Sequence, residues 1–360
     1  MILDPAGNLW GSERVLLDFL SSYEGKKKEV ALCCPPHSPL VKAVEALGIT
    51  VYPYFEGMLH EKGKLARLGA AIGLMRACRK HQADIIYVNQ AGATRIALFA
   101  ARLLRIPVIP HVRLLEDVEY IESLNVANRA MPRIFVISKF IAEAFRMEGG
   151  RNRIVCLYDA YKMHGSDEKD SAFSSSSKKL CCAGRLVPSK GQDILLYAMA
   201  ELRDQEVDVS LSLYGEGLPG ESYETDLLRV VKERNLNASV FFRGFVENIP
   251  HEMRQCSAVI CPSKIEPLGR VVLEAWDSST LPIVYRHSGG AAEIVAASGG
   301  GILYDEQTPN SLAQAIVECL SLQTDERREM IAKGRRWLKD NCEPVSYASK
   351  VQGILNEAAR

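Results

Sequence analysis

The sequence predicts an α/β protein built from two Rossmann-like, doubly wound parallel-sheet domains. Three observations carry this prediction: a length of 360 residues, short apolar runs that alternate with helical stretches, and a polar, serine-rich segment near the middle of the chain. A single hydrophobic core stops growing near ~250 to 300 residues, so a chain of this length is expected to form two domains.

The expected strands of the first half are unbroken apolar runs. Such runs are typical of strands that helices cover on both faces, as in a parallel sheet. Only three residues precede Asp4, so either the opening strand is short or the chain starts further upstream. The other strands of this half are expected at 29–34, 49–54, 84–88, 107–111, 134–137 and 153–158.

A second βαβ series follows the serine-rich segment at 164–178, which is expected to be a linker or surface loop. The expected domains are therefore 1–163 and 179–342, and a last helix at 343–360 is expected to return toward the N-terminal domain. The strands of the second half are expected at 179–183, 208–214, 239–242, 258–261, 282–285 and 301–303.

The overall charge excludes one class of partner. The chain holds 44 basic and 44 acidic side chains, so no net field attracts nucleic acid. The balance hides an asymmetry, because residues 1–160 hold 21 basic and 16 acidic side chains while residues 161–360 hold 23 and 28. The halves therefore carry +5 and −5, and smaller anions remain candidate ligands.

The ten cysteines show no CxxC spacing, and several fall inside apolar runs. They are expected to be reduced, buried thiols of a cytoplasmic protein rather than zinc ligands. The first residues lack a basic start followed by an apolar core, and no uncharged apolar run approaches the ~18 residues of a membrane span. The sequence therefore predicts neither export by a signal peptide nor an integral membrane protein.

Two cations follow the first strand of the second half. Arg185 and Lys190 lie five residues apart, just before a helical stretch that begins near Gly191. Positive side chains beside a helix N-terminus suit a diphosphate. Two solvated surface cations are the alternative interpretation.

Two carboxylates follow a later strand. Glu266 lies in the loop after 258–261, and Glu274 lies eight residues further on, in the expected helix. Ionised carboxylates accept hydrogen bonds from sugar hydroxyls. Between them, the backbone amides of 268–270 at a helix start are placed to hold a phosphate.

These segments form an ordered set: G-R-x4-K-G from Gly184, G-x-G from Gly215, F-x-G-F-V from Phe242, P-S-x2-E-P-L-G-x4-E-A from Pro262 and G-G-x2-E from Gly289. The set resembles the retaining nucleotide-sugar glycosyltransferases of family 4, which have the GT-B fold of two Rossmann-like domains facing a central cleft. The resemblance covers essentially the whole chain and is strongest across 180–295.

The resemblance implies roles for residues of the second half. It implies that Arg185 and Lys190 bind the donor diphosphate, that Glu266 contacts the donor sugar and that Glu274 holds the ribose. Leu268 departs from the phenylalanine of many members but keeps the apolar character. The further donor-binding residues implied are Gly11, Gly215, Gly217, Gly244, Phe245, Val246, Pro267, Leu268, Gly269, Arg270 and Val271.

In the first half, the loop that contains Gly11 resembles the family's glycine-rich loop. His111 follows a strand at the place where the family often has a histidine near the donor sugar, so it is assigned a catalytic role with Glu266, Arg185 and Lys190. A structural histidine is the alternative interpretation. The acceptor-side candidates are Trp10, Asn89, Arg113 and Ser138, with packing or solvated roles as alternatives.

The resemblance implies transfer of a hexose-type sugar from a UDP-, GDP- or ADP-sugar to a glycan, lipid-linked glycan or other hydroxyl acceptor, with retention, in cell-surface polysaccharide or lipopolysaccharide synthesis. No DxD motif follows a strand in the required way, so neither a metal nor another cofactor is expected. A GT-B sugar-nucleotide epimerase and a non-catalytic nucleotide-sugar-binding paralogue are the alternatives.

A basic stretch at 61–80 bears on localisation. Leu65, Leu68, Ile72 and Met75 recur at helical spacing among lysines and arginines. One interpretation is a helix that touches the inner face of the membrane and reaches a lipid-linked acceptor. The other interpretation is a helix of the Rossmann-like domain with a solvated basic face.

Overall fold

The structure is a computed structural model that describes residues 1–9, 11–53, 64–124, 129–146, 151–164, 178–218 and 220–359. Contacts divide the chain into two compact units: unit 1 is Met1–Lys162 with Asn341–Arg360, and unit 2 is Met163–Asp340. Most of the segment 164–178 that the sequence analysis assigned to a linker lies outside the described residues.

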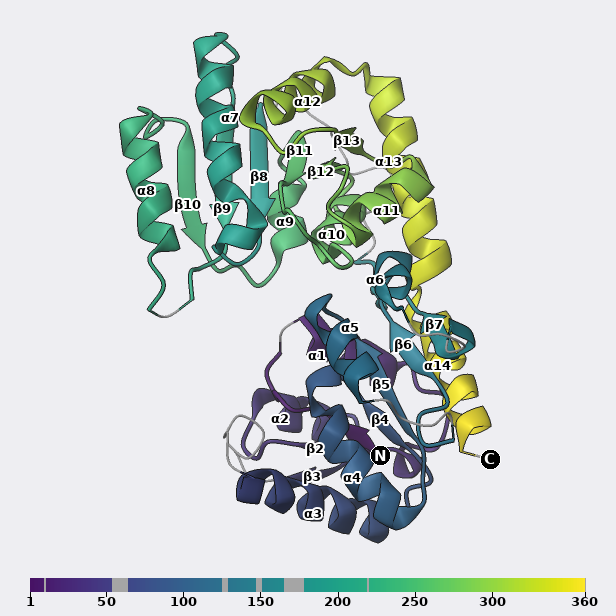
Figure 1. Ribbon diagram of the computed structural model, residues 1–360. Helices are drawn as coiled ribbons and strands as arrows, with labels where there is room; N and C mark the ends of the chain where they lie inside the picture. Colours follow the sequence, from purple (N-terminus) through teal and green to yellow (C-terminus); the bar gives the residue numbers. More distant parts are fainter. Residues whose placement is uncertain are drawn as a thin grey trace. The chain divides into compact units, whose positions relative to one another are not determined.

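Unit 1 contains a seven-stranded parallel sheet with the order β3-β2-β1-β4-β5-β6-β7 (Figure 1). Its strands are β1 (Ile2–Leu3), β2 (Ala31–Cys34), β3 (Thr50–Pro53), β4 (Ile86–Val88), β5 (Val108–Val112), β6 (Ile134–Val136) and β7 (Ile154–Cys156). Its helices are α1 (Gly11–Ser21), η1 (Lys27–Glu29), α2 (Pro39–Ala46), α3 (Lys64–His81), η2 (Ala91–Ala93), α4 (Thr94–Leu104), α5 (Glu116–Ser123), α6 (Lys139–Ala144), η3 (Arg151–Arg153) and α14 (Pro344–Ala358).

Helices cover both faces of this sheet, as the apolar strands predict. The helices α1, α2 and α14 pack on one face, while α3 and α4 pack on the other. Successive residues of β2 alternate between the two cores, so Cys33 and Cys34 lie on opposite faces. The C-terminal helix α14 thus belongs to the core of unit 1, where Tyr347 and Val351 pack beside α1.

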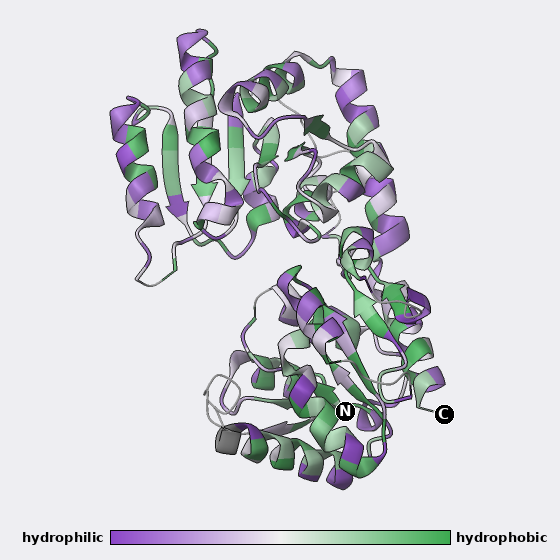
Figure 2. Cartoon of the chain, in the orientation of Figure 1, coloured by the Kyte–Doolittle hydropathy of each residue, from purple (hydrophilic) through white to green (hydrophobic). Residues whose placement is uncertain are grey.

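Unit 2 contains a six-stranded parallel sheet with the order β10-β9-β8-β11-β12-β13. Its strands are β8 (Lys179–Ala183), β9 (Ser210–Tyr214), β10 (Val240–Gly244), β11 (Ala258–Cys261), β12 (Leu281–Tyr285) and β13 (Ile302–Tyr304). Its helices are η4 (Pro188–Lys190), α7 (Gln192–Asp204), α8 (Tyr223–Glu233), α9 (Ile249–Met253), α10 (Arg270–Asp277), α11 (Gly290–Ser298), α12 (Pro309–Ser321) and α13 (Thr324–Cys342). The strands β8 and β10 are apolar over most of their length (Figure 2).

The predicted fold class is confirmed, and every predicted strand overlaps an observed one. The opening strand β1 has only two residues. All ten cysteines are free thiols and nine of them are buried. Within the described ranges, no helix combines the length and the apolarity that crossing a membrane requires.

The strand order reverses once in each sheet, between β1 and β4 in unit 1 and between β8 and β11 in unit 2. At such a switch point the loops that follow two adjacent strands leave on opposite sides, which opens a crevice at the carboxyl ends of the strands. Each sheet therefore offers one favoured place for a ligand.

Candidate functional site

Loops from four strands meet at the carboxyl edge of the sheet in unit 2. A parallel bridge joins Leu186, after β8, to Gly217, after β9. The amide of Lys264 donates to the carbonyl oxygen of Ser189 at 3.2 Å, which ties the loop after β11 to the loop after β8. The switch point between β8 and β11 lies under these loops, so the residues that the sequence analysis selected there do converge.

Lys190 and Glu266 form an ion pair across this switch point. The Lys190 Nζ donates to Oε2 of Glu266, and that oxygen also accepts from the Ser263 Oγ at 3.2 Å. The two paired side chains are 26% and 13% exposed. Burial opposes the charge of Lys190, but the Glu266 carboxylate outweighs burial and raises the pKa of the ammonium. Lys190 is therefore charged at neutral pH, and both side chains reach the surface.

Arg185 lies in the same loop with an exposed side chain, close enough to Lys190 for its charge to act against the Lys190 charge. Its guanidinium has no hydrogen bond or ion pair to another described residue. A lysine paired with one carboxylate and a nearby arginine without such a partner among the described residues form a site that attracts a multiply charged anion.

The backbone of Glu266 is fixed against the loop after β12. Its amide donates to the Ser288 carbonyl oxygen at 2.6 Å, and its carbonyl oxygen accepts from the Ala291 amide at 3.3 Å. A Cβ on Gly290 would lie 1.9 Å from the Pro267 carbonyl oxygen, so only glycine permits this approach. Gly269 is the N-cap of α10 with a φ of +84°, and the amides of the first turn of α10 follow it directly.

The other donor-side candidates lie in the same loops or near them. Leu268 is buried, and Glu274 is half-buried on α10. Gly215 and Gly217 follow β9, Gly244 ends β10, and Phe245 is 67% exposed just beyond it. The remaining candidates Pro267, Arg270 and Val271 flank Gly269, and Val246 packs against the small core beside α10.

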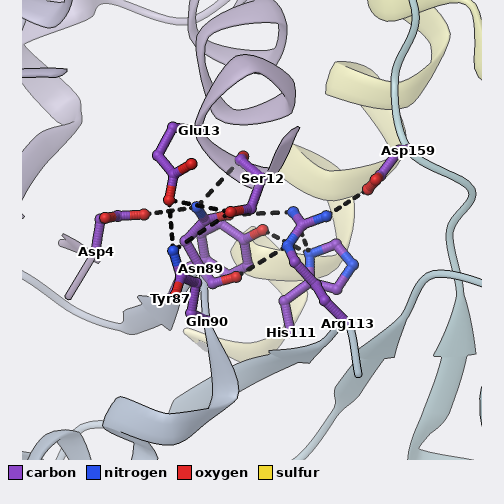
Figure 3. A network of polar contacts seen from close by, with 9 residues as sticks. All are labelled: Asp4, Ser12, Glu13, Tyr87, Asn89, Gln90, His111, Arg113 and Asp159. Atoms are coloured by element: carbon purple, nitrogen blue, oxygen red, sulfur yellow. Dashed lines mark hydrogen bonds and ion pairs between the residues drawn. The ribbon is translucent and has the colours of Figure 1, made fainter. Parts of the chain in front are cut away.

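A second polar cluster fills the switch point of unit 1 (Figure 3). Asp4, after β1, accepts a hydrogen bond from the Asn89 side-chain amide, after β4, at 2.7 Å. Arg113 donates to the Asn89 backbone and side-chain oxygens, both at 3.1 Å, and pairs with Asp159. Burial opposes the charge of Arg113, but Asp159 outweighs burial and raises its pKa. The two acceptor-side candidates Asn89 and Arg113 are thus in direct contact.

His111 belongs to the same cluster and is fully buried. Its Nδ1 lies 2.8 Å from the Tyr87 hydroxyl and 3.3 Å from the Arg113 Nη2. A guanidinium can only donate, so Nδ1 accepts and Nε2 carries the proton. Burial and then Arg113 hold the pKa of His111 well below its usual value. The neutral ring therefore offers Nε2–H, which has no partner among the described residues.

Three predicted residues of the first half remain to be placed: Ser138, Gly11 and Trp10. Ser138 is buried and its Oγ accepts from the Ile141 amide at 3.2 Å, which makes it the N-cap of α6. Gly11 begins α1. Trp10 lies outside the described residues.

Sequence reasoning missed several members of the unit 1 cluster. Glu13 is buried on α1, where it accepts from the Ser12 hydroxyl at 3.0 Å and from the Gln90 side chain. The sequence signal that could have identified these residues is position: Asp4 directly follows β1, and Asp159 lies just after β7. The missed residues that Figure 3 shows are Asp4, Ser12, Glu13, Tyr87, Gln90 and Asp159. Across the described ranges, no three His, Cys, Asp or Glu side chains form a group suited to a metal ion.

The apolar stripe predicted on the basic helix lies only partly on its core-facing side, because Met75 packs against the core while Leu68 does not. The side of α3 that packs on the sheet carries Leu74, Ala77 and Cys78, while Leu68 is 43% exposed. The cations at the C-terminal end of α3, Arg76, Arg79 and Lys80, are exposed. The helix is therefore a covering helix of the sheet with a basic outer face, and it keeps an exposed leucine that the packing leaves unexplained.

Residues 165–337 match the family model described as glycosyl transferases group 1, and residues 10–159 match the model described as Glycosyltransferase Family 4. A GDP-mannose-dependent α-(1-6)-phosphatidylinositol monomannoside mannosyltransferase of Mycolicibacterium smegmatis is 34% identical over 49% of this chain and 47% of the relative. An N-acetylgalactosaminyltransferase of Campylobacter jejuni, whose name gives a diphospho-undecaprenol-linked sugar, is 27% identical over 44% and 42%. The chain spans about half the length of these curated relatives.

Solved structures share the fold over the full length. The Anabaena HepE protein in complex with UDP and glucose gives a TM-score of 0.82 at 23% identity and covers 99% of this chain and 98% of its own. Sucrose-phosphate synthase of Thermosynechococcus elongatus gives 0.75 at 17% identity over 99% and 98%. These similarities show the two-sheet architecture.

Proposed function

The chain belongs to the GT-B glycosyltransferases of the group 1 and family 4 type, and from this premise we propose that it transfers a hexose-type sugar from a nucleoside diphosphate sugar to a hydroxyl acceptor, with retention at the anomeric carbon. The observation that carries the proposal is the meeting of Lys190 and Glu266 at the switch point of unit 2. The cation suits the diphosphate of the donor, and the carboxylate suits the sugar of the donor.

The proposed donor site separates charge recognition from sugar recognition. Lys190, Arg185 and the amides that start α10 bind the diphosphate, because cations and helix-start amides attract phosphate oxygens. Glu266 accepts hydrogen bonds from sugar hydroxyls, and Glu274 takes the ribose. GDP-mannose is the first donor to test, since the names of the mannosyltransferase relatives give it. UDP-glucose is the second, because it is bound in a HepE structure.

The proposed reaction needs charge stabilisation more than it needs a nucleophile. The bond between the anomeric carbon and the diphosphate oxygen breaks while the acceptor oxygen attacks from the same face. The departing phosphate oxygen takes the acceptor proton. Lys190 and Arg185 stabilise the negative charge that develops on the leaving group. We assign Glu266 to positioning, because a two-carboxylate mechanism needs an acid and a nucleophile on either side of the bond.

No metal or other cofactor takes part in this scheme, since the two cations supply the positive field. The proposed acceptor is lipid-linked, as in the names of the mycobacterial and Campylobacter relatives. The proposed setting is cell-surface polysaccharide or lipopolysaccharide synthesis, in the cytoplasm at the inner face of the membrane.

The test uses the full chain with GDP-mannose, UDP-glucose or ADP-glucose and with octyl glycosides as acceptor probes. We expect nucleotide release that depends on the acceptor, an unchanged anomeric configuration by NMR, and no loss of rate after metal removal with EDTA. Conversion of the nucleotide sugar without an acceptor would identify an epimerase instead. Binding of a nucleotide sugar without release under any acceptor would identify a non-catalytic paralogue.

A further inference from the structure

We propose that a groove in unit 1 holds the lipid chain of the acceptor and that two arginines at this groove bind the acceptor's phosphate. This inference rests on the proposed function and names the substrate class for it. The groove has a volume of about 630 Å³ and is lined by α3, the η2–α4 segment and residues 114–120. We call it the Phe99 groove.

Three large apolar side chains converge on this groove without being buried in the core. Leu68 of α3, Phe99 of α4 and Leu114 before α5 are 43%, 47% and 51% exposed. Single exposed apolar residues are ordinary, but three from separate elements that line one concavity mark a binding surface. A groove of this volume suits part of a small molecule better than a protein segment.

The charged groups of the groove indicate which kind of apolar ligand it binds. Arg67 and Arg95 line it, and both side chains are exposed. The Arg95 guanidinium lies 5.7 Å from the centre of the Tyr120 ring, which restricts its orientation. Neither arginine forms an ion pair with another described residue. Two unpaired guanidinium groups beside apolar side chains are complementary to a phosphate that carries an alkyl chain.

Asp117 is the acidic residue among the described lining residues. Burial, with a smaller contribution from Glu116, raises the pKa of Asp117 to about 6. At neutral pH it is an acceptor for hydroxyl groups, and it disfavours a phosphate at its own end of the groove. The phosphate is therefore expected between the two arginines.

The groove also adjoins the polar cluster of Figure 3. Pro5, which follows Asp4, and Gln90 are both lining residues. The Gln90 side chain donates to Glu13 and, at 3.3 Å, to the Ser12 hydroxyl. An acceptor whose chain lies on Phe99 and whose phosphate meets the arginines would therefore direct its polar end toward buried carboxylates that accept hydroxyl hydrogen bonds.

The experiment measures binding of decyl phosphate, below its micelle concentration, to the full chain by calorimetry. Decanol and inorganic phosphate are the comparison probes. We expect decyl phosphate to bind more tightly than either probe. The double variant Phe99→Asn with Leu114→Asn should weaken binding about tenfold or more, while Leu103→Asn should leave it unchanged. Leu103 is the matched control, because it is 57% exposed on α4 and does not line the groove.

A second pair of variants tests the arginines. Arg67→Gln with Arg95→Gln should reduce decyl phosphate binding to the level of decanol, whereas Arg102→Gln, an exposed arginine outside the groove, should not. Equal binding of decyl phosphate by the groove variants and the wild type would overturn the proposal. Binding of the same variants to anionic vesicles is measured as well. If Arg102→Gln weakened vesicle binding as much as the groove variants do, the proposal would be overturned in favour of a general membrane surface.

The nucleotide-sugar assay distinguishes this proposal from the proposed function. If the protein bound decyl phosphate but showed neither binding nor turnover of a nucleotide sugar, sugar transfer would be refuted and the groove would remain a site for an amphiphile. If the protein bound or turned over a nucleotide sugar but the groove variants did not affect decyl phosphate binding, the lipid site would be refuted and sugar transfer would stand. All variants change exposed side chains, so unchanged thermal unfolding is the expected folding control.

Discussion

Lys190 and Glu266 lie 76 positions apart in the sequence and form a half-buried ion pair that joins the loop after β8 to the loop after β11. Each partner also reaches the surface at the switch point of the sheet. The pair thus holds the cation and the carboxylate in place before any donor arrives. A donor is expected to insert between them, with its phosphates taking the ammonium and its sugar hydroxyls taking the carboxylate.

Glu266→Gln tests the sugar end of this site. The amide cannot accept as strongly as the carboxylate, and hydrogen bonds to charged groups contribute about 1.5 to 3 kcal/mol. We expect the affinity for the nucleotide sugar to fall about tenfold to a hundredfold while the affinity for the nucleoside diphosphate alone stays within a factor of three or so. Calorimetry with both ligands measures this. Glu306→Gln, at an exposed glutamate of unit 2, is the control, and equal losses for both ligands would refute the sugar role.

Gly290→Ala tests the contact that fixes the Glu266 loop. The added Cβ would lie 1.9 Å from the Pro267 carbonyl oxygen, so the loop has to move. Overpacking of this kind typically costs about 1 to 3 kcal/mol, and we expect both a lower stability and weaker donor binding. Gly353→Ala is the matched control. It lies on α14 with open space around it, and it should be neutral or stabilising by up to about 1 kcal/mol. Denaturant unfolding that finds both variants alike would contradict the close contact.

The pH dependence of stability tests the neutral, buried His111. Its folded pKa lies below the unfolded value of about 6.5. Below that pH the unfolded chain therefore binds more protons than the folded chain. The contribution of His111 should decrease as the pH falls from about 6.5, by up to about 1.4 kcal/mol per pH unit.

The measurement compares urea unfolding of the wild type and of His111→Gln between pH 7.5 and pH 5, values chosen to bracket about 6.5. The free-energy difference between them should shrink toward low pH. His287→Gln, at an exposed histidine of unit 2, should keep the wild-type slope. A constant difference between the wild type and His111→Gln would show that this histidine titrates normally.

Arg113 and Asp159 test whether the unit 1 cluster is a cooperative network. Both side chains are buried, at 10% and 6% exposure. Removing one partner leaves the other charge uncompensated, which typically costs about 3 to 5 kcal/mol. We expect such losses for Arg113→Met and for Asp159→Leu singly, and a much smaller loss for the double variant. Chemical unfolding of the three variants measures the coupling, and additive losses would show that the two side chains act independently.

The sequence predicted the sheets well because strands buried on both faces leave unbroken apolar runs, such as 258–261. It selected Arg185, Lys190 and Glu266 from motifs at strand ends, and His111 from its place after an expected strand and from the family resemblance, and the roles of these residues stay predictions. It did not predict the ion pair of Lys190 with Glu266, since local spacing carries no information on contacts between distant loops. That contact follows from the adjacency of β8 and β11.

The unit 1 cluster was harder to predict for the same reason. Asp4 and Asn89 are 85 positions apart and meet because β1 pairs with β4. A carboxylate after a strand resembles an ordinary surface residue until the strand order is known. The Phe99 groove was missed as well, because Leu68 seemed part of a helical stripe and the approach of Leu114 to Phe99 depends on tertiary packing.

The measurement that tests the central claim most directly is a thermal-unfolding panel of the full chain with UDP-, GDP- and ADP-sugars. A ligand that binds the folded state alone raises its stability by mass action. We predict that at least one donor raises the unfolding temperature of the wild type and of Lys264→Ala, an exposed lysine in the Glu266 loop, but not that of Lys190→Ala. No response to any donor, or an equal response of Lys190→Ala and the wild type, would contradict the account.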